Sequence, residues 1–166
     1  MVSRLLLVAL GGLMIMTGGP ETMDDDRNVS DEKAKISKVI HNSIGWAATK
    51  DKELSYSCFA HDSDLFWFSP RDDGTIHGFK AFTDLTEGFF MKDDFKAIRY
   101  EIKDLYIGLS RSGDVAWYHA RLDDFNEWQG QPACWEDVRW TGVLEKQNGR
   151  WVIVQMHFSE ANDKKP

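Results

Sequence analysis

The spacing of apolar residues changes once along this chain. Before Phe95 the apolar positions recur at helical intervals, and from Phe95 onward they recur at every second position. The first part therefore predicts a helix over 31–48, a shorter helix beginning at Asp51, and a third helix beginning at Gly78. Ser30 is a suitable cap for the first of these helices, because serine at that position accepts a free backbone N–H.

The alternating part of the chain predicts long strands. Turn-forming or polar segments divide it into four pieces, 95–109, 114–125, 134–146 and 150–159. A short apolar run at 65–69, ended by Pro70, predicts an earlier strand with a brief return at 75–77.

Helices followed by an antiparallel meander indicate an α+β fold. We expect three N-terminal helices packed on a strongly curved antiparallel sheet, which together form a cone with an internal pocket. Strands as long as 95–109 favour such curvature.

The N-terminus has the pattern of an export signal. Arg4 precedes an uncharged apolar run from Leu5 to Met16, and small residues follow it. The run is shorter than the ~20 residues that a membrane-spanning helix needs. We therefore expect a cleaved signal peptide at 1–19, a periplasmic or secreted protein, and no membrane association after cleavage. A flexible linker at 20–30, a folded domain at 31–160 and a polar tail at 161–166 complete the prediction.

Charge and cysteine content exclude some partners. The formal net charge of −7 disfavours nucleic acid and anionic lipid as partners. Cys58 and Cys134 are the only cysteines. An exported chain could join them in a disulfide, and two free thiols are equally compatible with the sequence.

The last two predicted strands can pair in two registers. A two-residue turn at Asn148-Gly149 would mix polar and apolar side chains on both faces. A three-residue loop, Gln147 to Gly149, would pair Trp140 with Met156 and produce one wholly apolar face. We favour the second register, because a half-buried sheet needs one apolar face. It places His157 on the outer face beside Arg139.

Two segments carry a resemblance to a known family. "GDVAWYHARLD" (113–123) and "RWTGVLEKQNGRWVIVQMHFS" (139–159) resemble the SnoaL-like branch of the nuclear transport factor 2-like superfamily, and the resemblance extends over 31–160. It implies a cone-shaped fold, commonly dimerised through the outer sheet face. It does not fix a function, because relatives include ketosteroid isomerases, polyketide cyclases, dehydratases and the calcium/calmodulin-dependent kinase association domain. Ser69 occupies the position at which the isomerases carry an aspartate before a proline. This difference argues against isomerase activity.

The strand 114–125 has two possible inward faces. Apolarity alone favours the set that contains Ala116, Tyr118, Ala120 and Leu122. The resemblance favours the other set, because the position that matches His119 carries a pocket-facing basic residue in the kinase association domains. We expect Trp117, His119 and Arg121 to face inward.

These considerations predict a pocket for a small organic ligand, acidic or carbonyl-bearing. His119 is the best candidate for an acid or base, and Arg121 could bind a carboxylate. No cofactor is expected, and the histidines lack metal-ligand spacing. The alternatives are an isomerase, cyclase or dehydratase that uses His119, and an oligomeric scaffold with a filled cone. The predicted ligand-binding residues are Trp46, Trp67, Phe82, Trp117, His119, Arg121, Trp140, Met156 and Phe158.

Overall fold

The computed structural model of the chain describes residues 21–71 and 74–160, with side chains described from Arg27 onward. The predicted signal peptide at 1–19 and the predicted tail at 161–166 lie outside the described residues.

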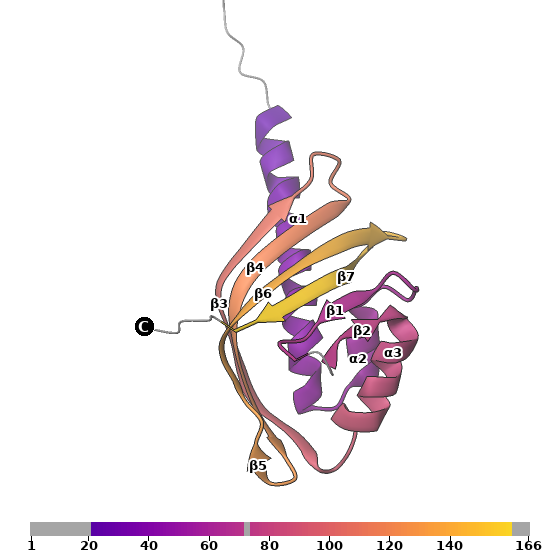
Figure 1. The fold of residues 1–166 in the computed structure, drawn as a ribbon. Helices are drawn as coiled ribbons and strands as arrows, with labels where there is room; N and C mark the ends of the chain where they lie inside the picture. Colours follow the sequence, from indigo (N-terminus) through magenta and orange to yellow (C-terminus); the bar gives the residue numbers. More distant parts are fainter. Residues whose placement is uncertain (1–20, 72–73, 161–166) are drawn as a thin grey trace, which may run out of the picture.

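Three α-helices form the N-terminal half of the fold (Figure 1). Asp51 caps α2, because its carboxylate accepts a hydrogen bond from Leu54 N at 2.9 Å. The helical segments are α1 (Glu21–Gly45), a 3₁₀ turn η1 (Trp46–Ala48), α2 (Lys52–Ser57), α3 (Gly78–Leu85) and a π-helical turn η3 (Thr86–Phe90).

Helix α1 begins earlier than the sequence analysis predicts. Residues 21–30 are helical, so the predicted linker is wrong there, and Ser30 lies inside the helix and does not cap it. No glycine or proline interrupts the chain between Glu21 and Ile44, so the sequence contains no residue that would break the helix there.

A seven-stranded sheet forms the other layer, in the order β2-β1-β7-β6-β4-β3, with β5 paired to β4. The sheet curls strongly, and the helices lie on its concave side (Figure 1). It is not wholly antiparallel, because β1 runs parallel to β7. The strands are β1 (Phe66–Phe68), β2 (Ile76–His77), β3 (Phe95–Leu109), β4 (Val115–Trp128), β5 (Gln131–Pro132), β6 (Trp135–Gln147) and β7 (Arg150–Ser159).

The β6–β7 hairpin combines the turn of one predicted register with the inward face of the other. Asn148 and Gly149 both have positive φ (51° and 77°), as a two-residue type I′ turn requires, so the predicted three-residue loop is wrong. Val154 is an extra residue between two paired positions, which makes a β-bulge. Beyond the bulge Trp140 pairs with Phe158, and His157 pairs with Thr141 and not with Arg139.

Because of the bulge, side chains from both alternating sets of β7 are buried. Met156 and Phe158 are buried and His157 is exposed, as the sequence analysis predicts. On the turn side of the bulge, Trp151 and Ile153 are also buried, although the predicted register puts them on the outer face with His157.

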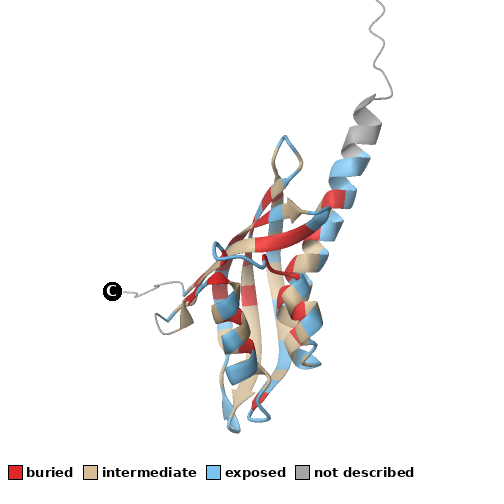
Figure 2. Cartoon of the chain, turned by 90° about the vertical axis from the view of Figure 1, so that its right-hand side faces the viewer, coloured by how far each residue is buried: buried red, intermediate tan, exposed pale blue. Residues whose placement is uncertain are grey.

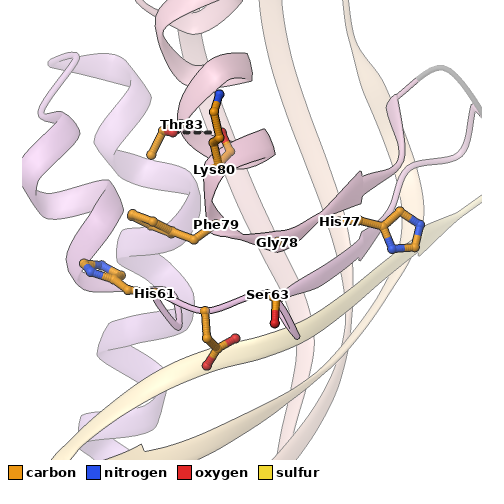
Figure 3. A pocket seen from close by; sticks show the side chains of 8 residues that line it. His61, Ser63, His77, Gly78, Phe79, Lys80 and Thr83 are labelled. Atoms are coloured by element: carbon orange, nitrogen blue, oxygen red, sulfur yellow. Dashed lines mark hydrogen bonds between the residues drawn. The ribbon is translucent and has the colours of Figure 1, made fainter.

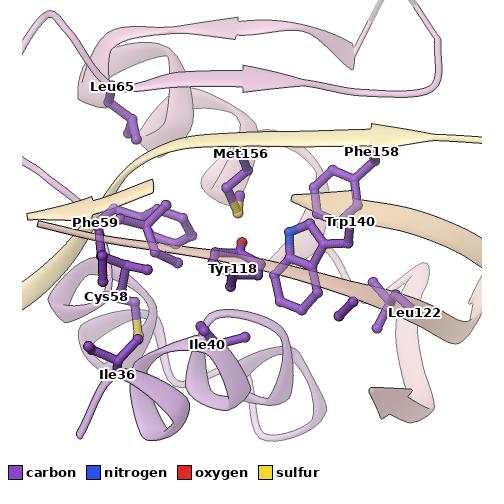
Figure 4. Packing of buried hydrophobic residues seen from close by; sticks show 14 of the residues in the cluster. Ile36, Ile40, Cys58, Phe59, Leu65, Tyr118, Leu122, Trp140, Met156 and Phe158 are labelled. Atoms are coloured by element: carbon purple, nitrogen blue, oxygen red, sulfur yellow. The ribbon is translucent and has the colours of Figure 1, made fainter. Parts of the chain in front are cut away.

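The core lies between the concave face of the sheet and helices α1, α2 and α3. The side chains drawn in Figure 4 come from both layers, and the buried positions in Figure 2 lie along the facing sides of helices and strands. The largest fully buried side chains include Trp140, Phe59, Phe82, Phe158, Ile36 and Ile40.

A buried carboxylate connects α1 to the hairpin. Glu32 Oε2 accepts hydrogen bonds from Trp151 Nε1 at 2.6 Å and from Lys146 Nζ at 2.8 Å, and its Oε1 accepts from Lys35 Nζ at 2.7 Å. Hydrogen bonds from Lys146, Lys35 and Trp151 lower the pKa of Glu32 to about 2. The cluster holds the N-terminal half of α1 against β6 and β7.

Both cysteines are free thiols. Cys58 is buried beside the core, and burial raises its pKa to about 11. Cys134 is exposed near the start of β6. Of the two alternatives that the sequence left open, the structure has two unpaired cysteines.

Candidate functional site

Strand β4 presents the face that apolarity favours, so the inward orientation predicted for Trp117, His119 and Arg121 is wrong. The buried side chains of β4 are Ala116, Tyr118, Ala120 and Leu122. Trp117 is 47% exposed, and His119 is exposed as well. These three residues lie on the outer face and cannot line the interior of the cone.

Each outward side chain has a local partner that explains its position. The indole of Trp117 lies over Gly108 on β3, where a Cβ would come within 2.3 Å of it. His119 stacks on Tyr106, with ring centroids 5.1 Å apart. Arg121 pairs with Asp137, whose positive φ of 53° belongs to a bulge in β6.

Five of the predicted ligand-binding side chains do meet on the inside. Trp67, Trp140, Met156 and Phe158 form an aromatic and thioether surface on the concave face of the sheet, and Phe82 packs against it from α3. Trp67 contacts Phe158 at 5.6 Å and Phe82 at 6.2 Å between ring centroids, and Trp140 stacks on Phe158 at 5.5 Å. Met156 pairs with Trp67 in the sheet. Trp46 is buried elsewhere, edge-on to Phe90, outside the main core cluster.

Three buried polar atoms on this surface have no hydrogen-bond partner among the described residues. They are Trp67 Nε1, Trp140 Nε1 and the hydroxyl of Tyr118, and we name these three groups the interior donors. In the part of the chain that the structure describes, the only other such atom is Ser55 Oγ on α2. Native proteins satisfy most buried polar groups, so three unpaired groups in one region are unusual.

Gly142 explains why Tyr118 can lie flat in this region. Tyr118 pairs with Gly142 across β4 and β6, and its ring covers the glycine so closely that a Cβ would lie 2.5 Å from Tyr118 Cε1. The phenol therefore extends over β6 toward β7. In Figure 4 the Tyr118 hydroxyl and the indole nitrogen of Trp140 both point to the side where Met156 lies.

The concave face is less buried toward the far end of β4. Asp124 follows Leu122 on the same face, pairs with Tyr100 on β3 and with Trp135 on β6, and is only partly buried. Desolvation raises the pKa of Asp124. Trp135 connects this end to the interior, because its ring lies 5.0 Å from that of Phe158.

A hollow of about 630 Å³ lies outside the cone, beside the start of α3 (Figure 3). Its polar groups are held by local hydrogen bonds. His61 Nε2 lies 2.8 Å from Tyr56 O while its ring stacks on Phe79, and Asp62 accepts from the backbone of Asp64 and Leu65. We assign this hollow to loop structure. It is lined by His61, Asp62, Ser63, His77, Gly78, Phe79, Lys80 and Thr83.

The described part of the chain contains no group of three or more His, Cys, Asp or Glu side chains placed to hold a metal ion. None of the helices within 21–71 and 74–160 is both long and apolar enough to cross a membrane.

The sequence analysis missed Tyr118, Asp124 and Trp135. Tyr118 could have been predicted from the sequence, because it belongs to the more apolar set of β4. An aromatic residue among small residues is typical of an inward face. Trp135 lies beyond a bulge in β6, where counting by two from the start of the strand gives the wrong face. Asp124 belongs to the same alternating set of β4 as Leu122, so the choice of the opposite face excluded it.

Similarity to solved structures agrees with this architecture. A nuclear transport factor 2-like superfamily protein from Salmonella enterica aligns with a TM-score of 0.67 at 20% identity, over 82% of this chain and 96% of that chain. A protein with a cystatin-like fold from Novosphingobium aromaticivorans has the same TM-score at 12% identity, over 89% and 94% of the two chains. The association domain of C. elegans CaMKII has a TM-score of 0.57 at 20% identity, over 79% and 97%.

These likenesses define the class of fold, a nuclear transport factor 2-like cone. The family model described as "SnoaL-like domain" matches residues 36–163, so the chain belongs to the SnoaL-like family. No curated protein matches the chain.

Proposed function

We propose that the protein binds a small organic molecule on the concave face of its sheet. The observation that carries this proposal is the set of three interior donors, buried without partners in an aromatic surface. Leaving such groups unpaired costs about 1–3 kcal/mol each, and a bound molecule would recover that cost. The partly buried Trp67, Trp135 and Tyr100 lie on the same face and offer a route of entry.

The test is to identify what the folded protein carries. The purified full chain is extracted with organic solvent and the extract is analysed by mass spectrometry, alongside Trp140→Ala protein prepared in the same way. We expect a small molecule that accompanies the wild type and is depleted in the variant. An extract with no bound molecule, together with no thermal stabilisation by any compound of a small-molecule library, would favour a scaffold with a filled cone.

Asp124 favours a second candidate, acid–base catalysis as an isomerase, cyclase or dehydratase. The catalytic role predicted for His119 moves to Asp124, because His119 lies on the outer face and Asp124 lies on the concave one. A carboxyl group with a raised pKa holds its proton closer to neutral pH, as a general acid requires.

Replacing Asp124 with asparagine tests whether the ionised carboxylate lowers the stability of the folded protein. A raised pKa means that folding favours the protonated form, so the ionised form is destabilising at neutral pH. We expect Asp124→Asn to raise the melting temperature at pH 7 and to have little effect in acid, below the normal pKa of an aspartate. The control is Asp93→Asn at an exposed turn position, which should show no pH-dependent gain. A lower melting temperature at pH 7 would show that the carboxylate is a structural acceptor.

We also propose that two copies associate through the outer face of the sheet. Three of the large exposed hydrophobic side chains, Phe68, Tyr106 and Trp117, lie on this face, between 47% and 52% exposed. Side chains of this type are enriched at protein interfaces.

If two copies associate through the outer face, a charged residue placed on that face should disrupt the dimer. Trp117→Glu and, independently, Phe68→Glu should convert a dimer to a monomer in light scattering after size exclusion. Val29→Glu, at an exposed hydrophobic position on α1, should leave the dimer intact. Circular dichroism confirms that each variant is folded. A wild-type monomer at micromolar concentration would contradict the proposal.

Export remains part of the proposed function. The apolar run from Leu5 to Met16, with Arg4 before it and small residues after it, supports this part of the proposal. The intact mass of protein expressed in a bacterium with its native leader would reveal cleavage. A full-length mass in the cytosolic fraction would contradict export.

A further inference from the structure

The outer face of β6 carries opposite charges at its two ends. Strand β6 lies between β7 and β4 in the sheet, and the helices lie on the other side of that sheet (Figure 1). Alternate residues of β6 are buried, which leaves the remaining set on the outer face. This outer set is, in order along the strand, Arg139, Thr141, Val143 and Glu145. The face therefore reads positive, neutral, neutral, negative.

Neither of these charges is neutralised within the described part of the chain. Arg139 is exposed and has no carboxylate there within ion-pair distance. It lies directly opposite Arg121 in the ladder with β4, and Arg121 already pairs with Asp137. Like charges at opposite positions of a ladder are destabilising, so Arg139 lacks a counter-charge. Glu145 is also exposed, and its carboxylate accepts only a long hydrogen bond of 3.5 Å, from Gln147 Nε2.

A two-fold axis makes this pattern complementary to itself. A symmetric dimer uses the same surface on both copies, so the contact must match itself after rotation. If two outer faces stack with their β6 strands antiparallel and the axis level with Gly142, position 139 of each copy lies opposite position 145 of the other. Stacking with parallel β6 strands would instead place Arg139 opposite Arg139. The charges therefore favour the antiparallel arrangement.

The neighbouring strands fit the same axis. The positions in register with Gly142 fall between Trp117 and His119 on β4 and between Gln155 and His157 on β7. The axis would thus bring the indole of Trp117 against the imidazole of the partner's His119. It would bring the amide of Gln155 against the partner's His157. A pair of planar rings and a pair of hydrogen-bonding groups are both favourable contacts at an interface.

We propose that two copies of this chain associate with their β6 strands antiparallel about an axis at Gly142, and that Arg139 of each copy pairs with the partner's Glu145. Stacked sheets lie about 10 Å apart, a gap that the long side chains of arginine and glutamate can bridge from opposite sides. The inference rests on the proposed dimer, and it adds the orientation of the two copies and the residues that select it.

Charge reversal at each end of β6 tests the pairing. The dissociation constant of the full-length dimer is measured by sedimentation. Arg139→Glu and, separately, Glu145→Arg should each raise it at least about tenfold, because two ion pairs become two like-charge contacts in every dimer. The double variant Arg139→Glu/Glu145→Arg exchanges the charges and should recover the wild-type affinity. Circular dichroism verifies that each variant is folded.

An equimolar mixture of the two single variants gives an independent test. In a mixed dimer both ion pairs are restored, since one copy carries two negative ends and the other two positive ends. We expect native mass spectrometry to show the mixed dimer as the main dimeric species. The matched controls are Lys38→Glu on α1 and Glu53→Arg on α2, which make the same charge reversals at exposed positions of the helical layer. They should leave the dissociation constant unchanged.

The outcomes separate this inference from the proposed dimer. A wild type that stays monomeric would overturn both. If the wild type is a dimer and the single variants dimerise equally well, Arg139 and Glu145 lie outside the contact and the inferred orientation is wrong. If the single variants are weakened but neither the double variant nor the mixture recovers, the two side chains do not pair with each other, and the dimer has another orientation.

Discussion

Replacing Glu32 with alanine is expected to lower the free energy of unfolding by about 3 kcal/mol, because removal of one partner from a buried ionic cluster leaves the others without compensation. Trp151 is almost fully buried and would lose the acceptor of its indole N–H. Lys146 and Lys35 retain access to water, which keeps the cost near the lower end of the range for such clusters. Urea unfolding followed by circular dichroism measures the effect.

The same cluster sets an acid limit on stability. The pKa of Glu32 is lowered from 4.5 to about 2, so its contribution is complete above pH 4.5 and is lost as the pH falls toward 2. Glu32→Gln should therefore flatten the decline of stability over this interval. Glu53→Gln, at an exposed position in α2, should leave the decline unchanged. Equal slopes for wild type and Glu32→Gln would show that other carboxylates determine the acid sensitivity.

The second large effect is expected at Gly142. An alanine there would place its Cβ 2.5 Å from Tyr118 Cε1 and 2.7 Å from the backbone oxygen of Gln155. The backbone oxygen cannot move without disturbing β7, so Tyr118 must be displaced. We expect Gly142→Ala to cost about 2 kcal/mol in thermal or urea unfolding, as overpacking of a core typically does.

Gly142→Ala should also reduce the amount of the small molecule that accompanies the purified protein, because the Tyr118 hydroxyl would leave its position. Gly88→Ala is the matched control, since a Cβ at Gly88 meets nothing within 4 Å and φ there is not positive. It should be neutral in both measurements. A stable Gly142→Ala protein that carries as much of this molecule as the wild type would mean that the Tyr118 hydroxyl does not contact the ligand.

The sequence predicted the elements well where one physical signal dominated. The period-two pattern gives β3 with its observed bounds and β7 as well. Asp51 caps the second helix as its side-chain chemistry suggests. The first helix was predicted too short, because Ser30 fits a cap position but an uninterrupted helical sequence precedes it.

The candidate site was harder to predict, because its geometry depends on contacts between strands. On β4 the simple rule of apolarity was correct, and the resemblance misled the choice of Trp117 and His119. The bare surface of Gly108, which Trp117 covers, is visible only once β3 and β4 are in register. The absence of hydrogen-bond partners at Tyr118 and Trp140 is likewise a property of packing that no local pattern encodes.

The bulge at Val154 gives the hairpin one residue more than its partner strand needs. Removal of that surplus residue would restore a regular ladder and keep Met156 and Phe158 inward, with a change only in the local bend of β7. Similar surplus positions occur twice in β3 and once in β6. Single-residue insertions and deletions at these four points could therefore make the cone deeper or shallower without replacing any side chain that lines it. Chain length at the bulges is thus a variable of the depth of the cone, independent of the residues that line its concave face.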